Sequence, residues 1–160
     1  MITQALLHEL FEYKEGFLYW KVSSSKKIKV GAKAGYLRKT GYCDIRINKK
    51  PYLAHRLIFM MFNGYMPIEV DHHDNNPSNN KIENLRASTH FENSRNSKVR
   101  SDSSLGIKNI GWCKNSNKFR VVLKINGKAK NFGSFKDLEL ADLVATMVRE
   151  KYHGEFARHK

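Results

Sequence analysis

The sequence has few of the features that mark exported, membrane-spanning or disulfide-stabilised proteins. Its two cysteines, Cys43 and Cys113, are too far apart to form a CxxC metal knuckle, and we expect no disulfide between them. The longest apolar run covers residues 57–62, whereas a membrane-spanning helix needs roughly 20 residues. The first ten residues lack the basic and apolar regions of a secretory signal. We therefore expect a cytoplasmic protein with no membrane partner.

Acidic residues are also scarce, and positive charge predominates. The 160 residues include 29 Lys and Arg against 15 Asp and Glu, which gives a net charge of +14. Such a surplus favours a polyanionic partner, above all a nucleic acid. Apolar residues make up 41% of the chain, which is enough for a hydrophobic core. The length fits one ordinary domain or two small ones.

The charge and the composition change along the chain. Residues 97–136 contain ten basic side chains and a single acidic one, Asp102. The stretch 97–106 is polar and rich in serine, which is typical of a linker. The prediction is therefore a domain over 1–96, a linker over 97–106 and a second domain over 107–160. Two cations of the linker, Lys98 and Arg100, either follow a phosphate backbone or are simply solvated, and the sequence leaves both open.

The first part of the chain is predicted to mix helices and strands. Thr3 can cap a short helix, and residues 17–22 form an extended segment. A hairpin is expected from strands at 35–38 and 42–47. The dense apolar stretch that follows, 54–62, predicts a buried helix.

The polar segment 69–96 carries the residues suited to chemistry. It is predicted as a strand ending at residue 72, a turn-rich loop over 74–80, a return strand over 82–86 and a helix opened by a capping box of Thr89 and Glu92. Four loop asparagines are expected to be turn formers: Asn75, Asn76, Asn79 and Asn80. This strand–strand–helix arrangement brings four polar residues toward one place: Asp71, His72, Asn84 and Asn93.

Such a cluster is suited to metal-assisted hydrolysis of a phosphodiester. Asp71 and the amide oxygen of Asn93 are hard ligands, of the kind preferred by Mg²⁺ or Mn²⁺, and one ion per active site is expected. His72 has a side chain that can deprotonate water near neutral pH. Asn84 is expected to hold the imidazole in one orientation.

Residues 52–96 resemble the HNH nuclease motif in its phage and intron homing-endonuclease form. The matching stretches are YLAHRL, VDH, NNKIENLR and FENSRN. The resemblance implies that Asp71 and Asn93 bind the metal, that His72 is the general base and that Asn84 positions it. It also implies cleavage that leaves 5′-phosphate and 3′-hydroxyl ends. Three further residues are candidates for supporting this site: His55, His73 and Arg86.

Two of these supporting residues have open roles. His73 stands where the family is usually apolar, so two neighbouring histidines are candidates for the base. His55 is either a structural residue at the entry of a helix or a partner of the site.

The last part of the chain is predicted as a three-stranded antiparallel sheet and one helix. The strands are expected at 107–112, 119–125 and 128–132, with Asn126-Gly127 as a hairpin turn. Asp137 is expected to cap a helix that extends to about residue 152. The face of the sheet opposite the helix would then be basic.

Residues 105–158 resemble the plant ethylene-response-factor type of DNA-binding domain. The resemblance rests on the GW…KFRV…GK…FGSF series and on HGEFAR near the end. In that family the sheet enters the major groove of DNA. By position, the resemblance implies five DNA contacts: Lys108, Trp112, Arg120, Lys124 and Lys130.

The sequence therefore predicts an α+β protein: an HNH nuclease domain of the ββα-metal type, followed by a DNA-binding sheet and helix. The expected activity is Mg²⁺-dependent hydrolysis of double-stranded DNA by a homing-type enzyme, monomeric or dimeric on DNA, with no small-molecule substrate. Two other functions remain: a non-catalytic DNA-binding regulator with a degenerate nuclease fold, and a basic RNA-binding protein.

Overall fold

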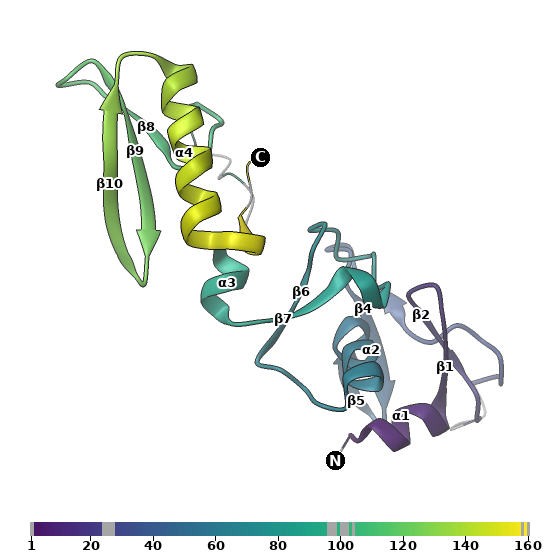
Figure 1. Cartoon of the computed structure of the whole chain (residues 1–160). Coiled ribbons are helices and arrows are strands. Elements are labelled where there is room, and N and C mark those ends of the chain that lie inside the picture. The colour runs from purple at the N-terminus through teal and green to yellow at the C-terminus, as the bar shows by residue number, and fades with distance from the viewer. Residues whose placement is uncertain are drawn as a thin grey trace. The chain divides into compact units, whose positions relative to one another are not determined.

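The computed structural model describes residues 2–23, 28–95, 99, 103, 105–157 and 159. The chain divides into two compact units, residues 1–89 and 90–160, each with its own hydrophobic core (Figure 1). This division falls before the expected linker. Most of that linker, including Lys98 and Arg100, lies outside the described residues, so the boundaries 1–96 and 107–160 stay predictions.

In its described residues, the first unit combines two helices, a 3₁₀ turn and three small antiparallel sheets. The sheets pair β1 with β2, β4 with both β3 and β5, and β6 with β7. In chain order the elements are α1 (Gln4–Leu10), β1 (Phe11–Lys14), β2 (Phe17–Trp20), β3 (Tyr36–Leu37), β4 (Cys43–Ile47), β5 (Lys50–Leu53), α2 (Ala54–Asn63), β6 (Glu69–His72), η1 (Ile82–Asn84) and β7 (Leu85–Ser88).

Local sequence signals explain both helices of this unit. The hydroxyl of Thr3 accepts a hydrogen bond from the amide of Leu6 at 3.2 Å, which confirms the predicted cap of α1. The apolar stretch that was expected to be a buried helix is α2, and it ends where Gly64 adopts a left-handed conformation with φ of 77°.

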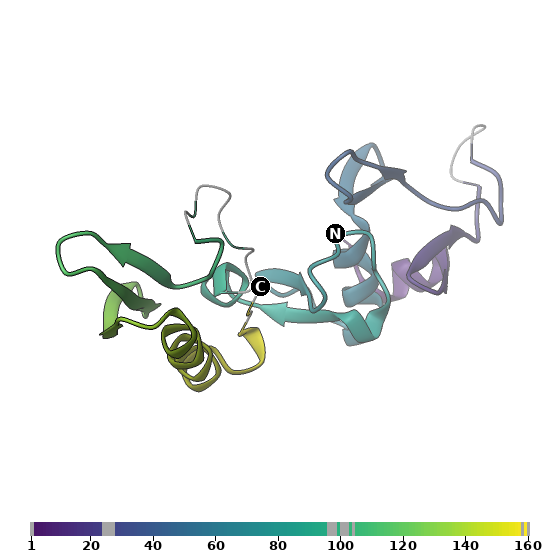
Figure 2. The same cartoon turned by 90° about the horizontal axis from the view of Figure 1, so that it is seen from above.

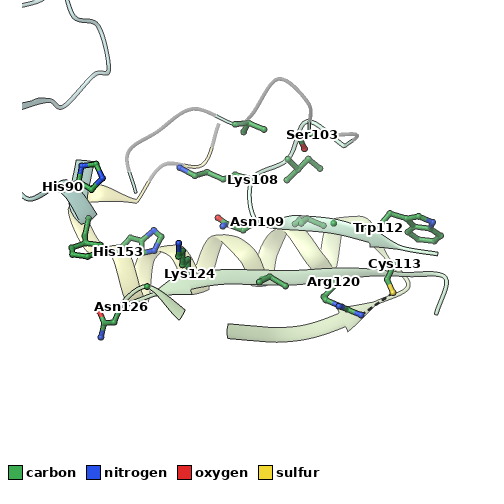
Figure 3. A pocket seen from close by; sticks show the side chains of 17 residues that line it. His90, Ser103, Lys108, Asn109, Trp112, Cys113, Arg120, Lys124, Asn126 and His153 are labelled. Atoms are coloured by element: carbon green, nitrogen blue, oxygen red, sulfur yellow. Dashed lines mark hydrogen bonds between the residues drawn. The ribbon is translucent and has the colours of Figure 1, made fainter. Parts of the chain in front are cut away.

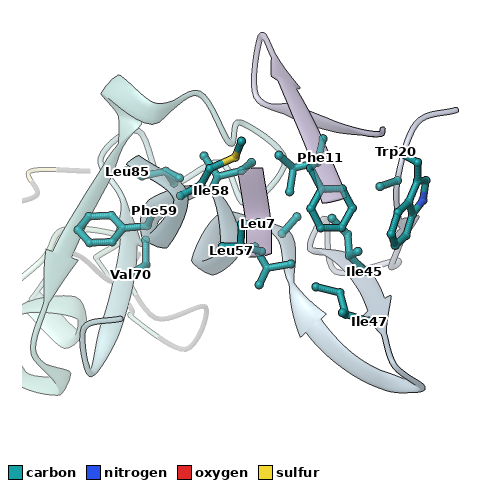
Figure 4. Close-up of a cluster of buried hydrophobic side chains, with 14 residues drawn as sticks. Leu7, Phe11, Trp20, Ile45, Ile47, Leu57, Ile58, Phe59, Val70 and Leu85 are labelled. Carbon is teal, nitrogen blue, oxygen red and sulfur yellow. The ribbon is translucent and has the colours of Figure 1, made fainter. Parts of the chain in front are cut away.

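The core of the first unit surrounds α2 (Figure 4). Leu57 and Ile58 of this helix are fully buried, and side chains from α1 and from strands β1, β2, β4, β6 and β7 pack around the helix. Burial of one such side chain contributes about 1.5–3 kcal/mol. The core therefore holds the β6–β7 ribbon, which carries the candidate site, against the rest of the unit.

The return strand of the site differs from the prediction. It was expected over 82–86, but residues 82–84 form the 3₁₀ turn η1, and β7 begins only at Leu85. The amide of Asn84 donates to the carbonyl of Lys81, which closes this turn. The difference matters because the turn directs the side chain of Asn84 back toward the preceding loop.

The second unit contains a short helix, a three-stranded antiparallel sheet and a long helix. The sheet has the order β10-β9-β8, and α4 lies against one face of it in both views (Figures 1 and 2). This is the sheet and helix expected from the sequence. The elements are α3 (His90–Arg95), β8 (Ile110–Cys113), β9 (Lys118–Ile125), β10 (Lys128–Phe135), α4 (Leu138–His153) and the 3₁₀ turn η2 (Gly154–Phe156).

Two local predictions for this unit are confirmed. Asn126 and Gly127 both have positive φ, of 49° and 80°, as the two-residue hairpin turn requires. A carboxylate oxygen of Asp137 accepts from the amide of Leu140 at 3.0 Å and caps α4. Ala141 and Ala145 are buried, so small side chains let this helix approach the sheet closely.

The first strand of the sheet is shorter than predicted. It was expected from residue 107, but Lys108 and Asn109 form a turn, and β8 begins at Ile110. Asn109 has a φ of 67°, in the left-handed region that asparagine tolerates better than most residues. Arg149, which is fully buried in α4, holds this turn by donating to the carbonyl of Lys108 at 2.7 Å.

Candidate functional site

The candidate active site begins at the end of β6, where two consecutive polar residues are buried. Asp71 and His72 are 6% and 4% exposed. The strand is anchored from α2, because Arg56 donates to the carbonyls of Pro67 and Ile68 at 3.0 and 2.9 Å. The core and this anchor therefore fix where Asp71 and His72 lie.

The imidazole of His72 contacts three side chains from different parts of the first unit. Its Nε2 lies 3.0 Å from Oδ1 of Asn80. The rings of His55 and Tyr42 lie beside it, with centroids at 4.9 and 6.1 Å. Hydrogen bonding and packing both restrict this ring, as a group that must meet a substrate in one orientation requires.

His55 takes part in this cluster as a neutral side chain. Burial is the main cause, and electrostatic interactions with His72 and Arg56 add to it, so that the pKa of His55 is lowered to about 3. Its Nδ1 is buried without a hydrogen-bond partner among the described residues. His55 lies in the first turn of α2 and also beside His72, so both roles left open for it stay predictions.

Asn84 braces the loop between β6 and η1. Its amide nitrogen donates to Oδ1 of Asp74 at 2.9 Å and to the carbonyl of Asn79 at 2.8 Å, while its oxygen accepts from the amide of Asp74. Burial raises the pKa of Asp74, but hydrogen bonds from Asn79, Asn76 and Asn84 outweigh it and hold that pKa below its usual value. The bonds of Asn84 therefore organise the loop, and its role toward His72 remains a prediction.

Two turns from the first 50 residues press against the same loop. A Cβ on Gly16 would lie 2.9 Å from the amide nitrogen of Lys81, and one on Gly41 would lie 2.7 Å from Cγ of Pro77. Both glycines have positive φ. The hydroxyl of Tyr13 also accepts from the amide of Ile82 at 3.0 Å. The sheets before α2 thus support the loop that carries Asn80.

The carboxylate of Asp71 forms an ion pair with Arg86, which lies directly opposite on β7. Both Nε and Nη2 of Arg86 donate to Oδ2 of Asp71, at 3.0 and 2.8 Å. This pair holds the carboxylate in place. It does not exhaust the acceptor capacity of a carboxylate, which offers about four lone-pair sites on its two oxygens.

The donor chemistry at Asp71 fits a hard divalent cation. Within the described residues no three His, Cys, Asp or Glu side chains are grouped as ligands for a metal ion. Mg²⁺ does not need such a group, because it keeps several waters and uses one or two protein oxygens together with substrate phosphates. The carboxylate of Asp71 is a donor of that kind.

The remaining predicted site residues differ in their exposure and in the unit to which they belong. His73 is exposed, whereas His72 is buried in the cluster. Asn93 lies on α3, which is part of the second unit, so its place in a common metal site with Asp71 stays a prediction. Arg86, predicted as a supporting residue, makes the ion pair described above.

A basic groove covers the face of the second unit's sheet that is turned away from α4 (Figure 3). Arg120, Val122 and Lys124 alternate along β9 with the buried Val121 and Leu123, so they point to this open face. Gly111 lies opposite Arg120 and adds no side chain over it. Lys108 lines the same groove from the turn before β8.

The other two predicted DNA contacts belong by register to the helix side of the sheet. Trp112 pairs with Phe119, their ring centroids are 4.7 Å apart, and the exposed part of the indole borders the groove at one end (Figure 3). Lys130 pairs with the buried Leu123, and its ammonium lies over the ring of Tyr152 on α4. The structure thus brings Lys108, Arg120 and Lys124 together and separates Lys130 from them.

Comparisons with known proteins identify the class. Residues 52–95 match the HNH endonuclease family, so the chain contains an HNH endonuclease domain in this stretch. The chain is also 34% identical over 108 residues to Protein 3.8 of Escherichia phage T7, a match covering 66% of this chain and 88% of that protein. The chain therefore belongs to the family of that phage protein. No solved structure matches it.

The HNH match ends before the second sheet and does not bear on it. The resemblance of residues 105–158 to the plant DNA-binding domain therefore remains a prediction. None of the helices in the described parts of the chain is long and apolar enough to cross a membrane.

Three residues of the site were missed by sequence reasoning. Asn80 was expected to be a turn former, and that prediction is wrong, because its side chain contacts His72. Tyr42 was assigned only to a strand, and Arg56 to a helix. The signal for Asn80 was weak, because it stands in an asparagine-rich loop where every asparagine has the same turn propensity.

Proposed function

We propose that this protein is a homing-type DNA endonuclease that requires Mg²⁺ or Mn²⁺, with His72 as its general base. One observation carries the proposal: within the segment that matches HNH endonucleases, His72 is buried at the end of β6 and its ring is held by Asn80 and His55. An imidazole held in one orientation is the arrangement that general-base catalysis needs.

The residues of this chain then have distinct roles. His72 takes a proton from a water molecule, whose oxygen attacks the scissile phosphorus. The bond to the 3′ oxygen breaks, and that oxygen takes a proton from solvent. Asp71 and Asn93 would hold the metal ion, and Arg86 keeps the Asp71 carboxylate in position. When bound, the ion stabilises negative charge on the phosphate and on the leaving oxygen.

The second unit is proposed to bind double-stranded DNA through the open face of its sheet. The support is the basic groove containing Lys108, Arg120 and Lys124 and the helix on the opposite face, as in the plant domain that the sequence resembles. Trp112 would contribute at the edge of the groove. A sheet of this kind can place side chains against base edges in the major groove.

Nicking of supercoiled plasmid tests the enzymatic proposal. The wild type should convert supercoiled DNA to open circles with Mg²⁺, and EDTA should abolish the conversion. One active site cuts one strand, so nicks are expected before double-strand breaks. Tight binding without nicking, on phage as well as plasmid DNA, would instead support a DNA-binding regulator with a degenerate nuclease fold. Cleavage confined to RNA would contradict both the DNA endonuclease and the DNA-binding regulator.

A further inference from the structure

The contact between His72 and Asn80 has a chemical consequence for the imidazole. Nε2 of His72 and Oδ1 of Asn80 are 3.0 Å apart, a normal hydrogen-bond distance. Both side chains are buried, at 4% and 3% exposure. Most buried polar side-chain atoms in proteins have a hydrogen-bond partner, and this contact provides one for each of the two side chains.

An amide oxygen only accepts hydrogen bonds, so Nε2 of His72 must carry the proton in this pair. A neutral imidazole has one protonated nitrogen, and the lone pair is then on Nδ1. If the amide were turned over, its NH₂ group would donate to Nε2 and impose the other tautomer. The orientation of the Asn80 amide therefore decides which nitrogen of His72 can act as a base.

Neighbouring residues hold the backbone of Asn80 in place, as it must be if its side chain is to orient His72. Gly16 packs against it so closely that a Cβ would lie 3.0 Å from the carbonyl carbon of Asn80. Tyr13 accepts from the amide of Ile82, two residues further on. On the other side of the loop, Asn84 donates to the carbonyl of Asn79. These contacts flank Asn80 and fix the position from which its side chain reaches His72.

We propose that Asn80 is a positioning residue that holds His72 in the Nε2-protonated tautomer, so that Nδ1 is the nitrogen that removes the proton from the attacking water. The part of this inference that concerns catalysis rests on the proposed nuclease function. The part that concerns the tautomer of His72 does not rest on the nuclease function, because the tautomer can be measured in the protein without DNA. After proton transfer both ring nitrogens carry a proton, and the ring returns to its starting form by releasing the Nδ1 proton to solvent.

The tautomer is read from nitrogen chemical shifts of the ¹⁵N-labelled full chain. The spectra are recorded at about pH 8.5, roughly two units above the ordinary histidine pKa of about 6.5. Long-range ¹H–¹⁵N correlation spectra distinguish protonated from unprotonated ring nitrogens, and the spectrum of His72→Gln identifies the His72 signals. The expected result is a protonated Nε2 and an unprotonated Nδ1. The opposite pattern in the wild type would overturn the proposal.

Two substitutions at Asn80 separate positioning from packing. Asn80→Ala removes the acceptor and should give a mixture of tautomers, whereas Asn80→Asp retains an oxygen and should keep Nε2 protonated. Asn76→Ala is the matched control, because Asn76 also makes a loop hydrogen bond, to the amide of Ser78, but is exposed. A His72 tautomer that is the same in Asn80→Ala and the wild type would overturn the proposal.

Nicking kinetics then test the consequence. Asn80→Ala should lower the rate at saturating enzyme by about 10- to 100-fold with little change in DNA affinity, as when a hydrogen bond that orients a functional group is lost. Asn80→Asp should recover most of that rate. If no variant nicks DNA but the tautomer follows Asn80, the nuclease function fails while the positioning role holds. If the wild type nicks DNA and the tautomer ignores Asn80, the positioning role fails alone.

Discussion

The candidate functional side chains of the two units are placed in opposite ways. In the first unit, acidic and polar groups are buried and joined by hydrogen bonds: Asp71 to Arg86, His72 to Asn80, and Asn84 to the loop. In the second unit, the basic side chains of β9 are exposed on a sheet face, above a core built largely from small and branched residues.

These two arrangements suit two different functions, catalysis and DNA binding. A buried polar group is costly unless it is satisfied, and a satisfied one is held in a single geometry, as catalysis requires. Exposed cations on a regular sheet can approach a phosphate backbone or base edges without such a constraint. We therefore expect substitutions in the buried cluster around His72 to change the rate of cleavage, and substitutions on the open face of the second unit's sheet to change the affinity for DNA.

The largest effect is expected at His72. His72→Ala should lower the nicking rate about 10²- to 10⁴-fold, the usual contribution of a general base, while the dissociation constant for DNA changes little. The neighbouring His73→Ala is the control, because His73 is exposed and lies outside the buried cluster. Gel-based nicking assays and equilibrium DNA binding measure the two quantities. A greater loss of rate in His73→Ala would assign the base to His73.

The next largest effect is expected on DNA binding, and it compares side chains on the two faces of the second unit's sheet. Arg120→Ala and Lys124→Ala should each weaken specific binding by about 1–3 kcal/mol if the side chains read base edges. Lys130→Ala, on the helix side, should weaken it less. Binding to specific and random duplexes at several salt concentrations measures this. Equal losses on both duplexes would make the open-face residues phosphate contacts, and a dominant effect of Lys130 would contradict the assigned face.

A smaller effect tests the support that the first 50 residues give to the loop that carries Asn80. Gly16→Ala combines a positive φ with a contact of 2.9 Å to backbone, so about 2–4 kcal/mol of stability should be lost. Gly31→Ala has the same kind of φ with no described atom within 4 Å, and should lose about 1–2 kcal/mol. Chemical denaturation measures both. Equal losses would show that the close approach to the loop is unimportant.

The smallest effect concerns pH. The pKa of His55 is about 3 in the folded protein against an ordinary value of 6.5, so the unfolded state binds more protons between these values. The free energy of unfolding should therefore fall as the pH falls below about 6.5. His55→Phe should remove about 1.5 kcal/mol of the decrease between about pH 6.5 and pH 5. Denaturation at both pH values tests this, and an unchanged pH dependence in the variant would contradict it.

The parts of the fold set by local chemistry could be predicted from the sequence. The caps of α1 and α4 and the Asn126-Gly127 turn depend on a few neighbouring residues, and the structure has them as expected. The position of Trp112 could not be predicted from alternation with Lys108. The turn at Asn109 breaks that alternation, and Trp112 instead follows Ile110 onto the helix side.

The candidate site also combines residues that could be predicted from the sequence with residues that could not. Asp71 and His72 stand out in the sequence because their residue types and spacing are specific. Asn80 does not, because only the approach of Gly16 and the position of β6 distinguish it from the other loop asparagines. The supporting contacts of His55 and Tyr42 also arise from tertiary packing, which brings segments far apart in the chain against one imidazole.

The separation of cleavage from DNA affinity is tested most directly by single-turnover nicking of one supercoiled plasmid over a range of enzyme concentrations. His72→Ala should reduce the rate at saturation and leave the half-saturating concentration nearly unchanged. The Arg120→Ala/Lys124→Ala double variant should raise the half-saturating concentration and retain the wild-type rate at saturation. If both variants changed both quantities to the same extent, the assignment of chemistry to the cluster around His72 and of binding to the open face of the second sheet would be contradicted.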